Sequence, residues 1–129
     1  MRVRILLVDD DIPSTDALKE LLEGAGFGVV CAGNGREALA HLRGGDSFCV
    51  ILLDVMMPVM NGYEFREAQL MDPKLASIPV IVVTADGRAR EKAKQIGTDR
   101  YLQKPLSPVE LLRAIGEYCP VPSAGIKPS

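Results

Sequence analysis

Residues 3–11 read VRILLVDDD, an apolar run that stops at three consecutive aspartates. The run is rich in valine, isoleucine and leucine with little polar alternation, which is typical of a strand covered on both faces. Residues 50–54 read VILLD and residues 80–84 read VIVVT, so the pattern returns twice. Each run predicts a buried strand with a polar or acidic side chain at its carboxyl end.

Shorter apolar runs and amphipathic stretches complete an alternation of strands and helices. Predicted strands span residues 3–8, 29–32, 50–53, 80–83 and 100–103, and predicted helices span residues 14–25, 36–43, 63–71, 88–96 and 107–118. This alternation predicts an α/β fold with a parallel sheet and helices on both faces. A chain of 129 residues has no room for a second half. That length favours a single doubly wound, flavodoxin-like sheet of five strands in the order 2-1-3-4-5, with five helices.

The composition indicates one globular domain and excludes several classes of protein. Fifteen Lys and Arg against seventeen Asp and Glu leave a net charge of −2, so neither nucleic acid nor a membrane surface is favoured as a direct partner. The longest apolar run, residues 48–53, is far too short to cross a membrane. We expect residues 1–119 to form the domain and the proline-rich residues 120–129 to form a tail or the start of a linker.

The N-terminus and the cysteines favour a cytoplasmic protein. The first apolar run is too short, and turns acidic too abruptly, for a signal peptide. The three cysteines, Cys31, Cys49 and Cys119, are odd in number and have no CxxC spacing. We therefore expect reduced thiols in a cytosolic protein.

Three carboxylates are predicted to meet at one edge of the sheet. Ligands bind folds of this kind at the carboxyl ends of the strands, where the strand order reverses. Asp9 and Asp10 follow the first predicted strand and Asp54 follows the third, and such close carboxylates need a compensating cation. Oxygen ligands without His or Cys favour magnesium. Lys104 and Thr84 end neighbouring strands and suit a phosphoryl group, which leaves Asp54 as the nucleophile.

The stretch around Asp54 resembles the receiver domain of bacterial response regulators. Residues 53–62 read LDVMMPVMNG, close to the family's LDxxMPxMdG, and the resemblance covers residues 3 to about 118. It implies that Asp54 is the phosphoacceptor and that Asp9, Asp10, Asp54 and the backbone carbonyl of Met56 bind magnesium.

The resemblance also assigns roles to three residues near the ends of the fourth and fifth strands. Thr84 would sense the phosphoryl group, Lys104 would pair with it, and Tyr101 would be the switch aromatic. Lys104 has to turn back toward Asp54, and both this requirement and the resemblance predict a cis peptide bond before Pro105.

The function implied is a signalling switch, not an enzyme acting on other substrates. A sensor histidine kinase or a histidine phosphotransfer protein would donate the phosphoryl group, and the domain would catalyse only its own phosphorylation and dephosphorylation. The output would reach an effector domain or a downstream protein through the face made by residues 88–96, 100–103 and 107–118. A homodimer is left open.

Several residues have a second interpretation. Tyr101 also suits a packed core aromatic, Thr84 an ordinary strand residue and Asp11 a helix cap. Asn61 stands where the family more often has Asp, a mild change in a predicted loop. Residues 98–100, TDR, replace the Ala-Asp-Asp of many winged-helix regulators, which puts their dimer salt bridges in doubt here.

Two rival functions are consistent with parts of the pattern. A magnesium-dependent phosphatase of the haloacid dehalogenase type also forms an aspartyl phosphate, but it needs an Asp where Met56 stands and a cap domain. A phosphate-free pseudo-receiver would be favoured by loss of the acid pair or of Lys104, and all of these are present.

Overall fold

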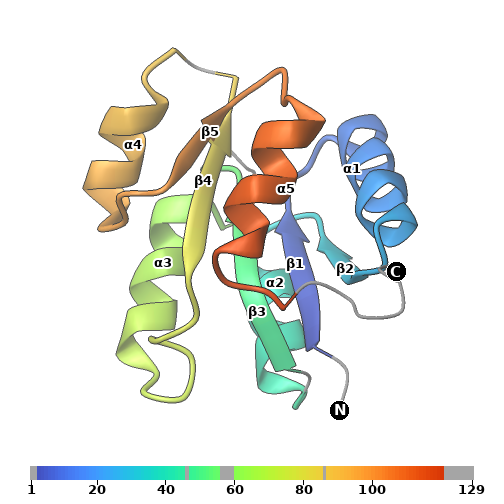
Figure 1. Ribbon diagram of the computed structural model, residues 1–129. Coiled ribbons are helices and arrows are strands. Elements are labelled where there is room, and N and C mark those ends of the chain that lie inside the picture. Colours follow the sequence, from blue (N-terminus) through green and yellow to red (C-terminus); the bar gives the residue numbers. More distant parts are fainter. Residues whose placement is uncertain (1–2, 46, 56–59, 86, 121–129) are drawn as a thin grey trace.

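The computed structural model describes residues 3–45, 47–55, 60–85 and 87–120. Strands and helices alternate along the chain (Figure 1). The strands are β1 (Val3–Val8), β2 (Gly28–Ala32), β3 (Ser47–Leu53), β4 (Val80–Thr84) and β5 (Tyr101–Gln103). The helices are α1 (Ile12–Gly24), α2 (Gly35–Arg43), α3 (Gly62–Met71), α4 (Ala89–Ile96) and α5 (Pro108–Gly116).

The five strands form one parallel sheet in the order β2-β1-β3-β4-β5, which confirms the predicted topology. Val8 of β1 lies level with Ala32 of β2 and with Leu53 of β3. At the other side of the sheet, Thr84 of β4 lies level with Gln103 of β5. The residues that follow β1, β3, β4 and β5 are therefore delivered to one edge of the sheet.

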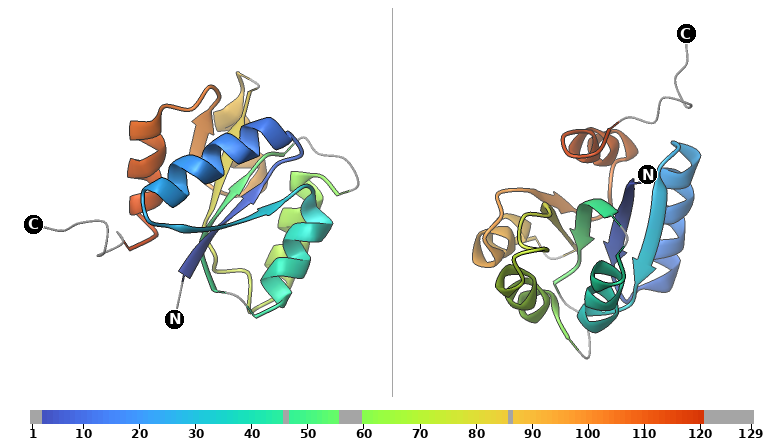
Figure 2. Two further views of the ribbon diagram at one scale, coloured as in Figure 1. Left: turned by 90° about the vertical axis from the view of Figure 1, so that its right-hand side faces the viewer. Right: turned by 90° about the horizontal axis from the view of Figure 1, so that it is seen from below.

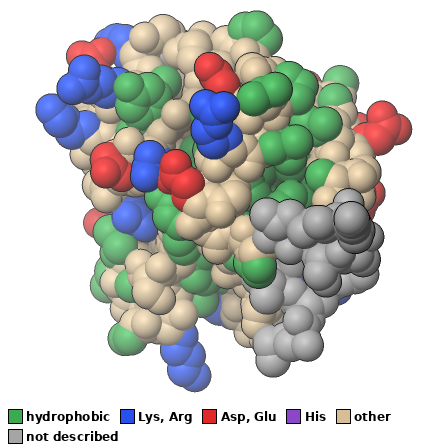
Figure 3. Space-filling view, in the orientation of Figure 1, with side chains coloured by type: hydrophobic (Ala, Val, Ile, Leu, Met, Phe, Trp, Pro, Cys, Tyr) green, Lys and Arg blue, Asp and Glu red, His purple; other side chains and the backbone are tan. Residues whose placement is uncertain are grey.

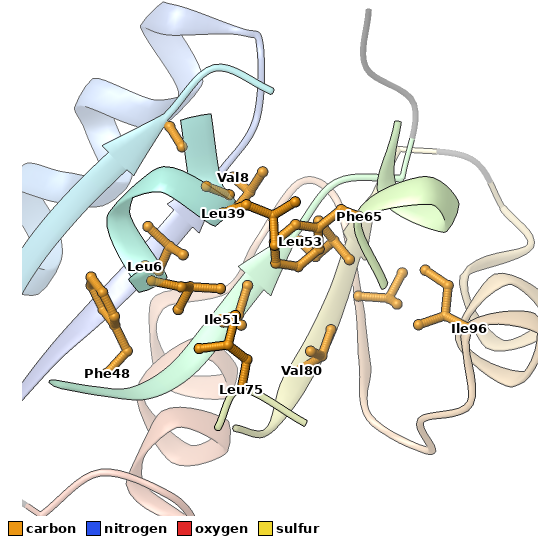
Figure 4. Packing of buried hydrophobic residues seen from close by; sticks show 14 of the residues in the cluster. Leu6, Val8, Leu39, Phe48, Ile51, Leu53, Phe65, Leu75, Val80 and Ile96 are labelled. Carbon is orange, nitrogen blue, oxygen red and sulfur yellow. The ribbon is translucent and has the colours of Figure 1, made fainter. Parts of the chain in front are cut away.

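Helices cover both faces of the sheet (Figure 2). The helices α1 and α5 lie on one face, where Leu22, Leu111 and Ile115 belong to a buried apolar cluster. The helices α2, α3 and α4 lie on the other face and contribute Leu39, Phe65 and Ile96, among others, to a second cluster (Figure 4). Because β1, β3 and β4 are covered on both sides, nearly all their described side chains are buried, which explains the lack of polar alternation.

Of the element boundaries that differ from the prediction, two have an identifiable reason. The strand β3 begins at Ser47, three residues before the predicted start. Residues 47 and 48 pair with Val3 and Arg4 of β1, and the register shifts after them, between Arg4 and Ile5. The helix α1 begins at Ile12 because Pro13 lies in its first turn, where the missing N–H has no helical partner to lose.

The expectation of three reduced thiols is wrong. Cys49 of β3 and Cys119, which follows α5, form a disulfide with a Cα–Cα distance of 5.3 Å. The two residues are 70 positions apart, so spacing along the chain gave no sign of the pairing. Cys31 is not part of a disulfide, and its partial burial raises the pKa of its thiol.

No helix among the described residues is long and apolar enough to cross a membrane.

Candidate functional site

Three carboxylates meet at the carboxyl edge of the sheet, as the strand ends predict. The backbone N–H of Asp54 donates to the carbonyl of Val8 at 2.9 Å, which holds the end of β3 against the end of β1. The N–H of Asp9 donates to the carbonyl of Ala32 at 3.0 Å. One carboxylate oxygen each from Asp9, Asp10 and Asp54 lies within 4.8 Å of the others. We call these three residues the acid group.

The acid group fits a hard divalent cation. Asp9 is buried, Asp54 is half-buried and Asp10 is exposed, so the group opens toward solvent on one side. Its ligand atoms are all oxygens, the set that Mg²⁺ prefers. Three carboxylates so close together repel one another, and a divalent ion among them would relieve that repulsion.

Lys104 is already in contact with the acid group. Its Nζ lies 2.6 Å from Oδ2 of Asp9, and both side chains are largely buried. The other oxygen of Asp9, Oδ1, accepts the backbone N–H of Asp11 at 2.9 Å. The backbone N–H of Lys104 donates to the carbonyl of Thr84 at 2.8 Å, and the Lys104–Pro105 peptide bond is cis, as expected.

Asp11 does not act as a side-chain cap. It stands at the N-cap position of α1, but its carboxylate makes no capping hydrogen bond. Its backbone N–H instead donates to Asp9, and its carbonyl accepts the hydroxyl of Thr15 at 2.9 Å. The turn after β1 therefore positions Asp9 through the Asp11 main chain.

Thr84 and Tyr101 differ in exposure. Thr84 ends β4 and is 3% exposed, at the same edge as the acid group. Tyr101 begins β5 and is 42% exposed, so it is not the packed core aromatic that was the alternative. Met56, whose carbonyl was expected to bind metal, lies outside the described residues.

Gly62 is a positioning residue that the sequence reasoning did not single out. It opens α3, and its N–H donates to the carbonyl of Val55 at 3.0 Å. A Cβ at this position would come within 2.5 Å of the Val55 Cα and 3.1 Å of the Asp54 carbonyl oxygen. Gly62 therefore allows α3 to pack directly against the backbone that carries Asp54. The signal in the sequence was the glycine that ends the motif at residues 53–62.

Asn61 is a helix cap rather than a loop residue. Its side chain accepts the N–H of Glu64 at 2.9 Å, and the Glu64 carboxylate accepts the N–H of Asn61 at 3.0 Å. This reciprocal pair is a capping box that fixes the start of α3. An asparagine serves here as well as an aspartate, because both side chains carry the accepting oxygen.

Arg100, the basic residue of the TDR stretch at residues 98–100, pairs with residues of its own domain. Arg100 forms an ion pair with Glu117 at 2.6 Å, and its Nε donates to the Tyr118 hydroxyl at 3.0 Å. The hydrogen bond to Tyr118, with the charge of Glu117 behind it, raises the pKa of the guanidinium. Arg100 thus links the start of β5 to the residues after α5.

Residues 5–116 match the response regulator receiver domain family. The chain belongs to this family. Receiver domains of response regulators are the phosphoacceptor domains of two-component signalling systems, and the strand order found here is that of their flavodoxin-like fold.

Individual proteins agree with the family match. The chain is 43% identical over 114 residues to the transcriptional regulatory protein CpxR of Escherichia coli K12, covering 87% of this chain and 47% of CpxR. It therefore spans about half the length of that regulator. Among solved structures, the Vibrio cholerae chemotaxis protein CheY4 is 33% identical with a TM-score of 0.81, covering 92% of this chain and all of CheY4.

A second solved receiver domain contains the metal. The receiver domain of the sensor histidine kinase PA1611 from Pseudomonas aeruginosa PAO1 is 27% identical with a TM-score of 0.82. The match covers 92% of this chain and 98% of that one, and magnesium is coordinated in its active site cleft.

Proposed function

We propose that this receiver domain accepts a phosphoryl group on Asp54 from a phosphohistidine, with Mg²⁺ held by Asp9, Asp10 and Asp54. The donor would be a sensor histidine kinase or a histidine phosphotransfer protein. One observation carries the proposal: three carboxylates lie within 4.8 Å of one another, and Lys104 lies 2.6 Å from the first of them. A further Mg²⁺ ligand from the carbonyl of Met56 remains part of the proposal.

The chemistry divides among the residues at the sheet edge. A carboxylate oxygen of Asp54 attacks phosphorus, the bond from phosphorus to the donor imidazole nitrogen breaks, and an aspartyl phosphate forms. Mg²⁺, when bound, neutralises oxygens of the transferred group and of the acid group. Hydrolysis by water then transfers the phosphoryl group to water, which returns the Asp54 carboxylate and releases inorganic phosphate. The domain would thus catalyse its own phosphorylation and dephosphorylation and no other reaction.

Lys104 would change partners during this cycle. In the unphosphorylated domain it neutralises Asp9. A phosphoryl group on Asp54 brings new anionic oxygens to the same edge, and a lysine on a flexible stem can follow them. Thr84, buried at the end of β4, would donate its hydroxyl to another phosphoryl oxygen.

We place the output surface on α4, β5 and α5, with Tyr101 as its switch residue. Tyr101 is 42% exposed and lies at the edge of the sheet, two positions before the residue level with Thr84. A groove of about 500 Å³ lies between β5 and α5, and its lining includes Tyr101, Glu110 and Arg113. Basic side chains gather over α4, at the upper left of Figure 3.

The output would act on an effector domain of the same protein or on a separate downstream protein. A homodimer through this face is a further alternative. Arg100 is paired with Glu117 of its own chain, which does not favour the charge pattern of winged-helix dimers.

We further propose that residues 1–119 form the receiver domain, that residues 120–129 form a tail or linker, and that the protein is cytoplasmic.

Intact-mass measurement after incubation with acetyl phosphate and Mg²⁺ tests the proposal. The domain should gain about 80 Da, the mass of one phosphoryl group, and lose it slowly. Asp54→Asn should gain nothing, whereas Asp16→Asn, an exposed carboxylate on α1, should behave as the wild type. No mass gain in the wild type would favour the phosphate-free pseudo-receiver instead.

A further inference from the structure

We propose that Cys49 and Cys119 are a reversible thiol pair that fastens the last turn of the domain to β3, and that a small thiol of the glutathione class opens it. The regulatory meaning rests on the cytoplasmic location proposed above, because a disulfide in a reducing compartment is usually transient or redox-sensing. The chemistry of the pair does not depend on phosphorylation.

The pair lies away from the acid group. Cys49 is the third residue of β3 and Asp54 follows the end of that strand, five positions on. At the rise of an extended strand this separation is about 16 Å. Cys119 approaches Cys49 from beyond the C-terminal end of α5, whereas the N-terminal end of α5 follows Lys104 and Pro105. The disulfide thus constrains one end of α5 and the phosphoryl site adjoins the other.

Both redox forms fit the surrounding structure. The Sγ of Cys49 lies 3.5 Å from the carbonyl oxygen of Arg4. In the disulfide this is a contact only, but in the reduced form the Cys49 S–H has an acceptor in place. Cys119 is 2% exposed within the apolar cluster under α5, an environment that suits a thiol as well as a disulfide sulfur. Both sulfur atoms would therefore have suitable surroundings as thiols after the disulfide is reduced.

Attack at Cys49 is the accessible route. Cys49 is partly exposed, whereas Cys119 is buried. The thiolate of a small thiol attacks Sγ of Cys49, the S–S bond breaks, and Cys119 leaves as a thiolate that takes up a proton. A second small thiolate attacks the sulfur of the first small thiol and releases Cys49. The protein disulfide gains two electrons and two protons, and the two small thiols become one small disulfide.

Other contacts would keep the released turn close to the sheet. The N–H groups of Tyr118 and Cys119 donate to the carbonyl of Ile115, which is fully buried. Arg100, which directly precedes β5, pairs with Glu117 and donates a hydrogen bond to Tyr118. Reduction should therefore loosen residues 117–119 without unfolding the domain. These residues also border the proposed output face, so the redox state would change the mobility of the backbone at the boundary of that face.

A glutathione titration of the native full chain tests the proposal, with free thiols counted by alkylation after denaturation. In oxidised glutathione one thiol, that of Cys31, should be alkylated, and in millimolar reduced glutathione all three should be. Amide exchange at Tyr118 and Cys119 should become about tenfold faster on reduction, with no change in α2. The control variant Cys31→Ser should shift every count down by one and leave the transition unchanged.

Any of three outcomes would overturn the inference: that the disulfide persists in reduced glutathione without denaturant, that it never forms in oxidised glutathione, or that amide exchange at residues 118 and 119 is the same in both forms. The phosphorylation assay is read separately in each redox form and should agree within about twofold, because the two sites are far apart. Loss of phosphorylation in both forms would refute the proposed function and leave the thiol result standing.

Discussion

Lys104 Nζ lies 2.6 Å from Oδ2 of Asp9, which joins the end of β5 to the end of β1 across two intervening strands. The contact brings a positive charge to a cluster that otherwise consists of three carboxylates. A divalent cation entering that cluster meets both the attraction of the carboxylates and the repulsion of the lysine. We therefore expect the ion pair to weaken the binding of a divalent cation by the unphosphorylated domain.

Removing the lysine should tighten metal binding and weaken phosphorylation. In Lys104→Ala we expect Mg²⁺ affinity to rise about fivefold or more, because a unit charge near the ion contributes about 1 kcal/mol even when water screens it. Isothermal titration of the metal measures this. Lys94→Ala, an exposed lysine on α4, is the matched control. Unchanged or weaker metal binding in Lys104→Ala would show that the lysine does not oppose the ion.

Asp10 should contribute to Mg²⁺ affinity and should lower the stability of the metal-free domain. Asp10→Asn removes one of three mutually repelling carboxylates, so the metal-free variant should melt at a higher temperature than the wild type. The rise in melting temperature on adding Mg²⁺ should be smaller in Asp10→Asn than in the wild type, because a ligand stabilises a protein by binding its native state and this variant should bind Mg²⁺ more weakly. Asp11→Asn, next to it but outside the acid group, should respond like the wild type. An Asp10→Asn titration that matches the wild type would remove Asp10 from the site.

Gly62 should be required for the position of Asp54. In Gly62→Ala the added Cβ meets the Cα of Val55 at 2.5 Å, a main-chain atom with little freedom to move. We expect a loss of about 1–3 kcal/mol in the free energy of unfolding and a slower phosphorylation of Asp54. Gly24→Ala, a helical glycine with open space around its Cβ position, should be neutral or slightly stabilising. Equal unfolding midpoints for the two variants in denaturant would contradict this account.

Thr84 should couple phosphorylation to the output face. Thr84→Ala should leave Asp54 phosphorylatable while weakening the response of α4 and β5, with a coupling of about 1–3 kcal/mol. Amide spectra of residues 88–103 recorded before and after phosphorylation measure that response. If the spectra change identically in the wild type and in Thr84→Ala, the signal takes another route.

The sheet and the acid group were predictable because parallel strands deliver their carboxyl ends to one edge. Asp9, Asp54 and Lys104 each directly follow a predicted strand, and Asp10 stands one residue after Asp9, so the strand order brought them together. The partner of Lys104 was not predictable in the same way. Strand ends do not distinguish Asp9 from Asp54 as the nearer carboxylate, and that choice depends on side-chain packing.

Features that rest on long-range packing were missed. The Cys49–Cys119 bond joins residues 70 positions apart, and it forms because the end of α5 packs over the first half of β3. The role of Gly62 depends on how closely α3 approaches Val55. The motif at residues 53–62 contains this glycine but does not by itself show that close approach. The cap at Asn61 was also missed, although its partner Glu64 stands three positions later and this spacing is a local signature of a capping box.

The position of the acyl phosphate on the chain decides whether Asp54 is the phosphoacceptor. Borohydride reduces an aspartyl phosphate to homoserine, so a digest of the phosphorylated and reduced domain reports which carboxylate reacted. We predict homoserine at position 54 when acetyl phosphate and Mg²⁺ are both present, and aspartate at positions 9, 10 and 54 when Mg²⁺ is chelated. Homoserine at position 9 or 10, or none anywhere under the complete conditions, would contradict the account.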